Sequence, residues 1–216
     1  MDRIDLLASL AKNSNILLDV GCDHAYTVIK AIESYNVGRA IASDIANMPL
    51  EMAKKNINEA GLNDRIKVLK SDGLKDINDE FDTLIISGMG GVLIKDILEN
   101  SLDKIKNKKL ILSPNRDFDV VREFLIKNDF MIEDEYAIND KKVFYEIIIF
   151  TPGKKKYTDF EIKYGPILLK KKNDEYLKYY KNKRNQLQSA INNIKDEAEL
   201  SKIKSLIKEY DIILGH

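Results

Sequence analysis

Residues 15–26 read Asn-Ile-Leu-Leu-Asp-Val-Gly-Cys-Asp-His-Ala-Tyr, an apolar run that ends in an acidic turn containing glycine. A short apolar run of this kind is typical of a β-strand buried on both faces, as in a parallel sheet covered by helices. Gly21 permits the tight turn that connects such a strand to a helix. Since open α/β sheets bind ligands beyond the carboxyl ends of their strands, the stretch predicts both the fold class and the edge where the site lies.

Apolar runs like the first recur along the chain and alternate with amphipathic segments, the pattern of βα units that wind a parallel sheet. Two last runs, 130–138 and 143–150, flank Asn-Asp-Lys-Lys and predict an antiparallel hairpin. Five parallel strands closed by such a hairpin make an α/β sheet that differs from the six-strand dinucleotide fold. The other strands are expected at 40–44, 66–69, 83–87 and 110–113, and helices at 26–34, 49–60, 93–100 and 122–127.

The pattern changes after Thr-Pro-Gly at 151–153, which predicts a boundary between a domain at 1–152 and a smaller one at 153–216. Beyond it, apolar residues recur at helical spacing and predict two helices in an antiparallel coiled-coil hairpin. We expect the hairpin to begin after Gly165-Pro166 and to turn near residues 195–199. The apolar stripe is interpreted as a packing seam; its members are Tyr176, Tyr180, Leu187, Ile191, Ile194, Ile203, Leu206, Ile207, Tyr210 and Ile213.

Composition excludes several classes of protein. The 216 residues are 44% hydrophobic and 32% charged, with four prolines and ten glycines, so the chain is neither disordered nor collagenous. Its longest apolar runs are far shorter than the ~20 residues of a membrane helix, and the charged start Met1-Asp2-Arg3 is unlike a signal peptide. Cys22 alone can form neither an internal disulfide nor a cysteine-based zinc site. We expect a cytoplasmic protein without membrane or metal partners.

The formal net charge is zero, yet the charges are distributed unevenly. Residues 1–150 hold 20 Lys and Arg against 26 Asp and Glu, whereas residues 151–216 hold 15 against 9. A basic C-terminal part favours an anionic partner such as nucleic acid. A lysine-rich helical surface in contact with solvent explains the same numbers and stays an alternative.

Acidic residues dominate the predicted site. Asp19, Gly21 and Asp23 form Asp-x-Gly-x-Asp, which lacks the Gly-x-Gly-x-x-Gly spacing that accommodates a pyrophosphate. Two carboxylates repel a pyrophosphate but favour a ligand with an ammonium or sulfonium group. Asp44 closes the second strand, where a carboxylate can accept hydrogen bonds from the hydroxyls of a ribose.

The next strand ends add polar residues and glycines. Asp72 can bind an adenine amine with Leu74 against the ring, although Asp44 and Asp72 could instead cap helices or turns. The fourth run leads into Gly-Met-Gly-Gly at 88–91, which removes side chains where a flat substrate would meet the cofactor. Asn115, after the fifth run, offers two donors and one acceptor to a base edge.

These motifs together resemble the bacterial tRNA (adenine-N1)-methyltransferases that modify adenine 22, a family of class I S-adenosylmethionine-dependent methyltransferases. The resemblance covers nearly the whole chain and implies a Rossmann-like fold, S-adenosyl-L-methionine as cofactor and tRNA as substrate. It rests on residues 19–26, 71–74, 87–91, 114–115 and 145–147. The implied cofactor pocket contains Asp19, Gly21, Cys22, Asp23, His24, Asp44, Ile45, Asp72, Gly73, Gly88, Met89 and Gly90.

The resemblance also defines the expected chemistry. Positive charge moves from sulfur to the purine during the transfer, and we expect Asp23, Tyr26 and Asn115 to stabilise it as catalytic side chains. Because N1 lies on the Watson-Crick edge, the adenine must be unpaired or extruded, so the rest of the RNA has to supply binding energy. Phosphate contacts are expected from Arg116, Arg122, Lys154, Lys155, Lys156, Lys170, Lys171, Lys172, Lys178, Lys181, Lys183 and Arg184.

Other functions fit parts of the pattern. A small-molecule methyltransferase would share the pocket and use the basic hairpin to dimerise, although we expect a monomer. A catalytically inactive nucleotide-binding or RNA-binding protein is the second alternative. An NAD-dependent oxidoreductase fits least, because the second glycine of the dinucleotide motif is missing.

Overall fold

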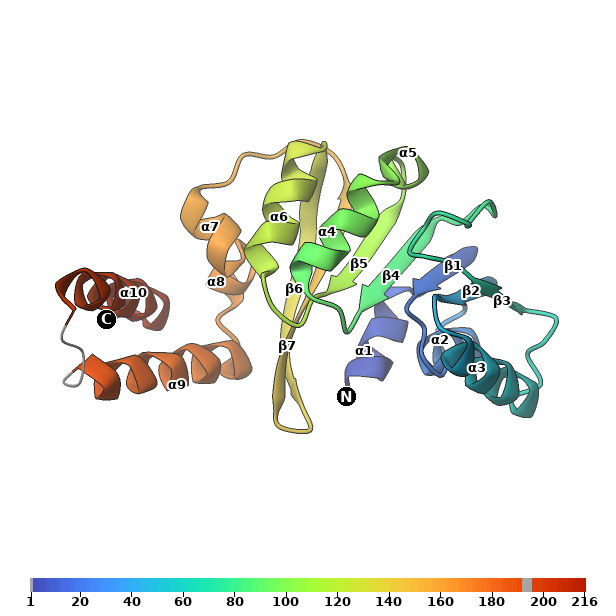
Figure 1. Cartoon of the computed structure of the whole chain (residues 1–216), viewed down its shortest axis with the longest axis horizontal. Helices are drawn as coiled ribbons and strands as arrows, with labels where there is room; N and C mark the ends of the chain where they lie inside the picture. Colours follow the sequence, from blue (N-terminus) through green and yellow to red (C-terminus); the bar gives the residue numbers. More distant parts are fainter. Residues whose placement is uncertain (1, 192–195) are drawn as a thin grey trace.

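A seven-stranded sheet forms the centre of the computed structural model, which describes residues 2–191 and 196–216 (Figure 1). The strand order is β3-β2-β1-β4-β5-β7-β6. The first five strands are parallel, and β7 runs antiparallel to both β5 and β6. The predicted α/β sheet with a final antiparallel hairpin is therefore confirmed. The strands are β1 (Ile16–Val20), β2 (Arg39–Asp44), β3 (Ile66–Lys70), β4 (Thr83–Ser87), β5 (Lys109–Ser113), β6 (Phe130–Asp140) and β7 (Val143–Pro152).

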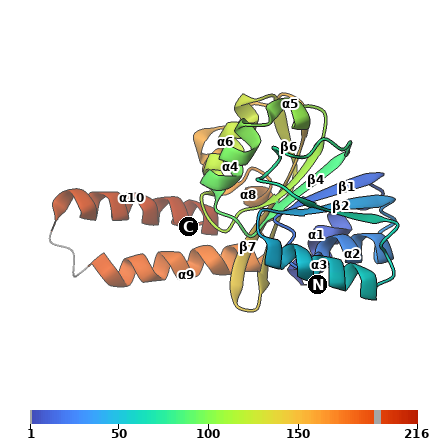
Figure 2. The same ribbon diagram turned by 45° about the vertical axis from the view of Figure 1, so that its right-hand side comes forward.

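Helices cover both faces of the sheet, which explains why its central strands β1, β4 and β5 are mostly apolar and buried (Figure 2). On β1, Leu17 packs with the first set of helices and Leu18 with the second, since successive side chains point to opposite faces. Both leucines are completely buried. The first set is α1 (Arg3–Leu10), α2 (Tyr26–Ser34) and α3 (Asn47–Glu59); the second is α4 (Gly91–Glu99), α5 (Leu102–Ile105) and α6 (Phe118–Lys127).

The N-terminal helix α1 was not predicted. Asp2 caps it, because its carboxylate accepts a hydrogen bond from the backbone N–H of Asp5 at 2.7 Å. Leu6 and Leu7 bury the helix against α2 and the sheet. Among the predicted helices, α6 begins at Phe118 rather than at residue 122, and its first turn already buries Val121.

Outside residues 192–195, the C-terminal part contains four α-helices. They are α7 (Asp159–Tyr164), α8 (Leu168–Lys171), α9 (Asp174–Ala190) and α10 (Glu197–Leu214). The last two run side by side in opposite directions (Figure 2), and Arg184 joins them through an ion pair with Asp211 at 2.9 Å. The first long helix begins at Asp174 and not directly after Gly165-Pro166 as predicted. The short helix α8 lies between them. Ile194 and the start of the predicted turn at residue 195 lie outside the described residues.

A cluster of tyrosines attaches these helices to the sheet. Tyr164, Tyr176, Tyr180 and Tyr210 pack together with Ala137 of β6. The hydroxyl of Tyr176 donates a hydrogen bond to the carbonyl of Tyr164 at 2.7 Å. Residues beyond the predicted boundary at 152 therefore contribute to a core shared with the sheet, and the division into two domains stays a prediction.

Arg122 is a correction to the sequence analysis. Its side chain is 0% exposed, and it donates to Glu135 at 2.7 Å and to Glu146 at 2.5 Å. Arg122 cannot contact RNA phosphates, so that prediction is wrong. The sequence did not reveal this because the two glutamates come from β6 and β7, which fold over α6 from later in the chain.

The described helices include none with the length and apolarity that a bilayer crossing requires.

Candidate active site

A cavity of about 460 Å³ opens at the carboxyl edge of the sheet, within the size range of small-molecule sites. It combines the turn after β1, the end of β2, the turn after β4 and the start of α1. Most of the predicted cofactor residues therefore converge, as the parallel strand order requires. The lining residues are Arg3, Ile4, Asp19, Gly21, Cys22, Asp23, His24, Tyr26, Thr27, Asp44, Ser87, Gly88 and Met89.

The turn between β1 and α2 has an unusual backbone. Gly21, Asp23 and Ala25 all have positive φ angles, of +74°, +51° and +62°. A Cβ atom on Gly21 would meet the Cε atom of Met89, the end of a flexible side chain that can move, so glycine is favoured here for its backbone conformation. The N–H groups of Gly21 and Cys22 both donate to the carbonyl of Ser43, which ties the turn to the end of β2. No side chain of the described residues caps α2.

Asp19 is the most buried acid of the cavity, with 3% of its surface exposed. Burial raises the pKa of its carboxyl from 3.8 to about 7; the nearby charge of Arg3 opposes the shift and that of Asp44 adds to it. Asp19 has no side-chain hydrogen bond to any described residue. A carboxylate buried in this way favours a cationic ligand, which would lower its pKa again.

Asp44 lies beside this acid, one strand further. Its Oδ1 atom accepts a hydrogen bond from the N–H of Ala46 at 3.0 Å, a local turn contact that leaves Oδ2 for a ligand. The interpretation of Asp44 as a residue that stabilises a turn is confirmed, whereas its contact with a ribose stays a prediction, although the side chain lines the cavity. Ile45 follows with 61% of its surface exposed at the same edge.

Asp72 and Gly73 stand outside the lining of the cavity. The Asp72 carboxylate forms an ion pair with Lys75, and Gly73 has a φ of +59° in the turn after β3. The strand order places this turn next to the end of β2. A contact between Asp72 and an adenine amine stays a prediction, because the carboxylate already has a local partner.

The glycine turn after β4 is fixed by the loop after β5. Asn115 donates its side-chain N–H to the carbonyl of Gly88 at 2.6 Å, and its backbone N–H donates to Met89 at 2.8 Å. A Cβ atom on Gly91 would lie 2.8 Å from the carbonyl oxygen of Arg116 and closer still to that of Asp117. Asn115 and Gly90 lie outside the cavity lining. The two hydrogen bonds of Asn115 hold the glycine turn in position.

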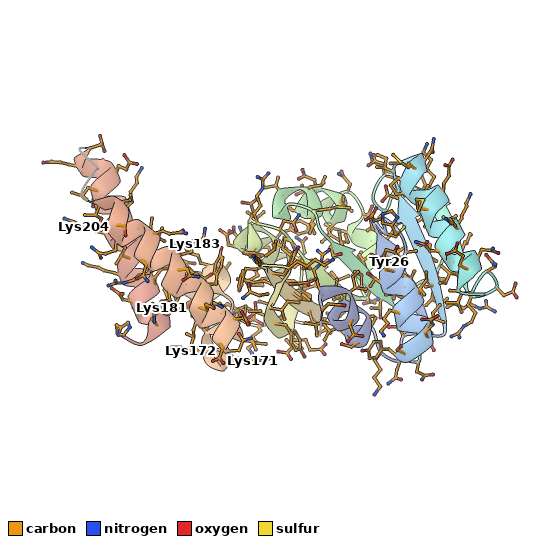
Figure 3. All side chains as sticks on the ribbon, turned by 90° about the horizontal axis from the view of Figure 1, so that it is seen from below. Tyr26, Lys171, Lys172, Lys181, Lys183 and Lys204 are labelled. Atoms are coloured by element: carbon orange, nitrogen blue, oxygen red, sulfur yellow. The ribbon has the colours of Figure 1, made fainter. Side chains whose placement is uncertain are left out.

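Two rings stand at the mouth of the cavity. His24 and Tyr26 have ring centroids 5.6 Å apart at an angle of 42°. Tyr26 is 52% exposed, and Figure 3 shows it in the half of the molecule that contains the sheet. His24 lies 3.5 Å from the Asp23 carboxylate, while its buried Nδ1 atom has no hydrogen-bond partner among the described residues.

Sequence reasoning missed Arg3, Ile4, Thr27 and Ser87. The guanidinium carbon of Arg3 lies 4.5 Å from the ring centroid of Tyr145, and its backbone N–H donates weakly to Asp140 at 3.4 Å. The available signal was the apolar spacing of α1 just before the first strand, which would have placed this helix near the sheet edge. The contact with Tyr145 has no local signature.

The basic residues expected to contact RNA differ in whether an acidic side chain of the described residues pairs with them. Lys154, Lys171 and Arg184 form ion pairs with Asp129, Asp134 and Asp211. Lys181 and Lys183 are exposed on α9, where no carboxylate of the described chain pairs with them. Figure 3 shows them along α9, in the opposite half of the view from Tyr26. The expected positions not mentioned so far are Arg116, Lys155, Lys156, Lys170, Lys172 and Lys178, none of which is fully buried.

A second hollow, the hairpin groove, has a volume of about 720 Å³ and lies between the tip of the β6–β7 hairpin and α9. Phe144 and Tyr179 stack in it with centroids 3.9 Å apart, and the Lys183 ammonium lies 5.5 Å from the Tyr179 centroid. Cations, amides and aromatic surface are the groups that bind single-stranded RNA. The groove is lined by Asn139, Lys142, Val143, Phe144, Glu175, Lys178, Tyr179, Asn182, Lys183 and Gln186.

Solved structures resemble this chain over its whole length. A Streptococcus pneumoniae protein in complex with S-adenosyl-L-methionine has a TM-score of 0.91 and 32% identity, covering 99% of this chain and 100% of that one. M. capricolum TrmK in complex with S-adenosyl-homocysteine has a TM-score of 0.88 and 26% identity, covering 99% and 96%.

Sequence comparison supplies the family. The tRNA (adenine(22)-N(1))-methyltransferase of Bacillus subtilis strain 168 is 33% identical over 215 residues, which cover 96% of this chain and 90% of that relative. The family model described as tRNA (adenine(22)-N(1))-methyltransferase matches residues 17–212. The resemblance inferred from the motifs is thus confirmed. Because the match runs from β1 through the cavity and into α10, the chain belongs to the tRNA (adenine(22)-N(1))-methyltransferase family.

Proposed function

We propose that this protein transfers the methyl group of S-adenosyl-L-methionine to N1 of adenine 22 in tRNA. The observation that carries the proposal is the cavity in which buried Asp19 and half-buried Asp44, at neighbouring strand ends, face the glycine turn after β4. Membership of the family indicates the reaction and the base.

The cavity fits the cofactor in shape and charge. Asp19 has no hydrogen-bonding partner within the described residues and favours a cation, while Asp44 keeps one oxygen for ribose hydroxyls. Gly21 and Gly88, both with positive φ, let the ligand approach the backbone closely. We assign the cofactor site to these residues together with Cys22, Asp23, His24 and Met89.

The chain has to position the adenine rather than activate it. S-adenosyl-L-methionine supplies an electrophilic methyl group, and adenine N1 carries a free lone pair at neutral pH, so no side chain must remove a proton first. We assign stacking of the purine to Tyr26 and stabilisation of its developing positive charge to Asp23. Asn115 holds the glycine turn in position, and we assign contact with the adenine to that turn. Orientation of this kind can contribute several kcal/mol.

The rest of the tRNA binds, in this proposal, along the hairpin groove and α9. Lys178, Lys181 and Lys183 supply cations for phosphates, and the aromatic pair in the groove offers a surface to unpaired bases. The proposal includes residues 153–216 as the RNA-binding part of a monomer that acts in the cytoplasm.

Mass spectrometry of tRNA nucleosides tests the function directly. The protein is incubated with S-adenosyl-L-methionine and either a tRNA transcript that has adenine at position 22 or the same transcript with guanine there. We expect 1-methyladenosine in the first reaction and none in the second. Methylation of another base, or equal product from both transcripts, would overturn the proposal.

A further inference from the structure

Two neighbouring aliphatic side chains are exposed where α4 begins, directly after the glycine turn. Val92 and Leu93 are 51% and 52% exposed, and neither belongs to a hydrophobic cluster of the described residues. The buried face of the helix is formed by Gly91, Ile94 and Leu98 instead. Single exposed apolar residues are normal on a protein surface, whereas adjacent ones beside a ligand site indicate a contact surface.

The position of this pair relates it to the cavity. The chain runs from Met89, which lines the cavity, through two glycines to Val92. Because α4 follows β4, its first turn lies at the carboxyl edge of the sheet. Side chains on an α-helix lean toward its N-terminus, so Val92 and Leu93 lean toward the edge where the cavity opens.

A cation lies beside the pair. The side chain of Arg116 is 80% exposed, and its Nε atom lies 3.5 Å from where a Cβ atom of Gly90 would be. The N–H of Gly91 donates to the carbonyl of Arg116 at 3.0 Å, which holds the loop after β5 against the start of α4. A guanidinium binds phosphate, and apolar side chains contact base faces. The surface therefore suits both parts of an RNA strand.

The reaction requires a surface of this kind. N1 lies on the Watson-Crick edge, so the adenine has to leave its stack before the methyl group can reach it. The vacated position exposes the faces of the neighbouring bases to water. Proteins that open a stack of bases frequently insert an apolar side chain between them.

We propose that Leu93, supported by Val92, inserts into the gap that adenine 22 leaves when it turns out of the tRNA, while Arg116 binds an adjacent phosphate. The inference rests on the proposed function. It makes the aliphatic pair positioning residues, which act on the flanking bases and not on the reacting atoms. A second copy of this chain is the competing occupant of the surface.

Two tRNA transcripts test this role. They differ in the base that faces adenine 22, which is uracil in the paired transcript and cytosine in the mismatched one. Methylation rates at pH 8 give kcat/KM for each. We expect Leu93→Ala to lower kcat/KM at least about fivefold on the paired transcript and less than about twofold on the mismatched one, because a mismatched base is easier to extrude.

Three controls accompany the test. Leu93→Met keeps the apolar volume and should stay within about twofold of the wild type on both transcripts. Ile212→Ala, which shortens a side chain 60% exposed on α10, should change neither rate. Calorimetry should give each variant the wild-type affinity for S-adenosyl-homocysteine, which shows that it folds.

Four results would overturn the inference. Leu93→Ala could leave the paired transcript unaffected, or slow both transcripts equally, which would describe an RNA contact without a part in extrusion. The wild type could methylate only the mismatched transcript. Light scattering could show a dimer that Leu93→Ala dissociates, which would assign the surface to a second copy. Failure of the proposed function looks different, because the wild type would then form 1-methyladenosine in neither transcript.

Discussion

At the scale of single residues, Asp19 illustrates the conflict between stability and binding. Its pKa is about 7 in the folded protein and near 3.8 in the unfolded chain, so the native state binds more protons between these values. Stability of the ligand-free protein therefore falls as pH rises from about 4 through 7. The ionised carboxylate of Asp19 therefore destabilises the ligand-free fold, and a bound cation would offset this cost.

We expect Asp19→Asn to stabilise the ligand-free protein, and the gain to grow by about 2–3 kcal/mol between pH 5 and pH 8, because the variant no longer ionises. The same variant should bind S-adenosyl-L-methionine at least about tenfold more weakly. Urea denaturation at the two pH values and calorimetry measure these effects. Asp23→Asn, at a side chain 71% exposed, is the matched control for the denaturation measurements alone, because Asp23 also lines the cavity. An equal gain at both pH values would contradict the assigned pKa.

Adjacent glycines of the turn after β4 are expected to behave differently. An added Cβ on Gly91 would collide with backbone carbonyls, whereas one on Gly90 would find the Arg116 side chain at an ordinary 3.5 Å. Gly91→Ala should therefore destabilise the protein by about 1–3 kcal/mol and reduce methylation, while Gly90→Ala leaves stability within about 0.5 kcal/mol. Thermal unfolding of both variants measures this difference in stability. Similar midpoints would show that the loop after β5 can move away from an added Cβ atom on Gly91.

At the scale of elements, the triad of Arg122, Glu135 and Glu146 connects helices to the hairpin. Glu135 also accepts hydrogen bonds from the N–H groups of Ile167 and Leu168, at 2.8 and 3.2 Å, and so ties the start of α8 to β6. Burial raises the pKa of Glu146 to about 7, which the charge of Arg122 opposes. The triad therefore connects the sheet to the C-terminal helices through buried ion pairs and hydrogen bonds.

Arg122→Met should destabilise the protein by about 3–5 kcal/mol at pH 8, because two buried carboxylates lose their cation. The loss should shrink at pH 5.5, where the carboxyls can take up protons. Urea denaturation at both pH values is the measurement. Arg116→Met provides the control, since that side chain is 80% exposed; a loss as large in the control would argue against the role of burial.

The helix α9 is expected to contribute more to RNA binding than α10. Reversing charge in Lys181→Glu with Lys183→Glu should raise the KM for tRNA at least about tenfold, while the affinity for S-adenosyl-homocysteine stays the same. Lys202→Glu with Lys204→Glu on α10 is the matched control, since both lysines are exposed and lie outside the hairpin groove (Figure 3 labels Lys204). Methylation rates at varied tRNA concentration give the KM of each variant. Equal effects of the two changes would show that α9 is not the main RNA-binding surface.

At the scale of the whole molecule, the positions of the charges matter more for RNA binding than the net charge, which is zero. Three acids line the cofactor cavity, and Lys181 and Lys183, which pair with no carboxylate of the described residues, lie along α9 in the other half of the molecule (Figure 3). A tRNA is large enough to contact both regions, whereas a small substrate is not. The separation of the charges is thus consistent with a macromolecular substrate.

Salt should affect the two ligands differently. Raising the salt concentration from about 50 to 200 mM should increase the KM for tRNA at least about tenfold, because bound phosphates release counterions. The affinity for S-adenosyl-L-methionine should change less than about twofold, since its charged partners are enclosed. Kinetics and calorimetry at the two concentrations give both numbers. A KM insensitive to salt would speak against lysine–phosphate contacts.

The sequence by itself determined the sheet and the acidic edge. Asp19, Gly21 and Asp44 follow directly on apolar runs, and parallel strands carry residues in such positions to one edge whatever the details of packing. It could not determine the state of Arg122 or the place of Arg3, because their partners, Glu135, Glu146 and Tyr145, are distant in the chain. Local patterns record the strands and turns that neighbouring residues favour. Only the tertiary structure decided which charges are buried together, since burial depends on elements that meet after folding.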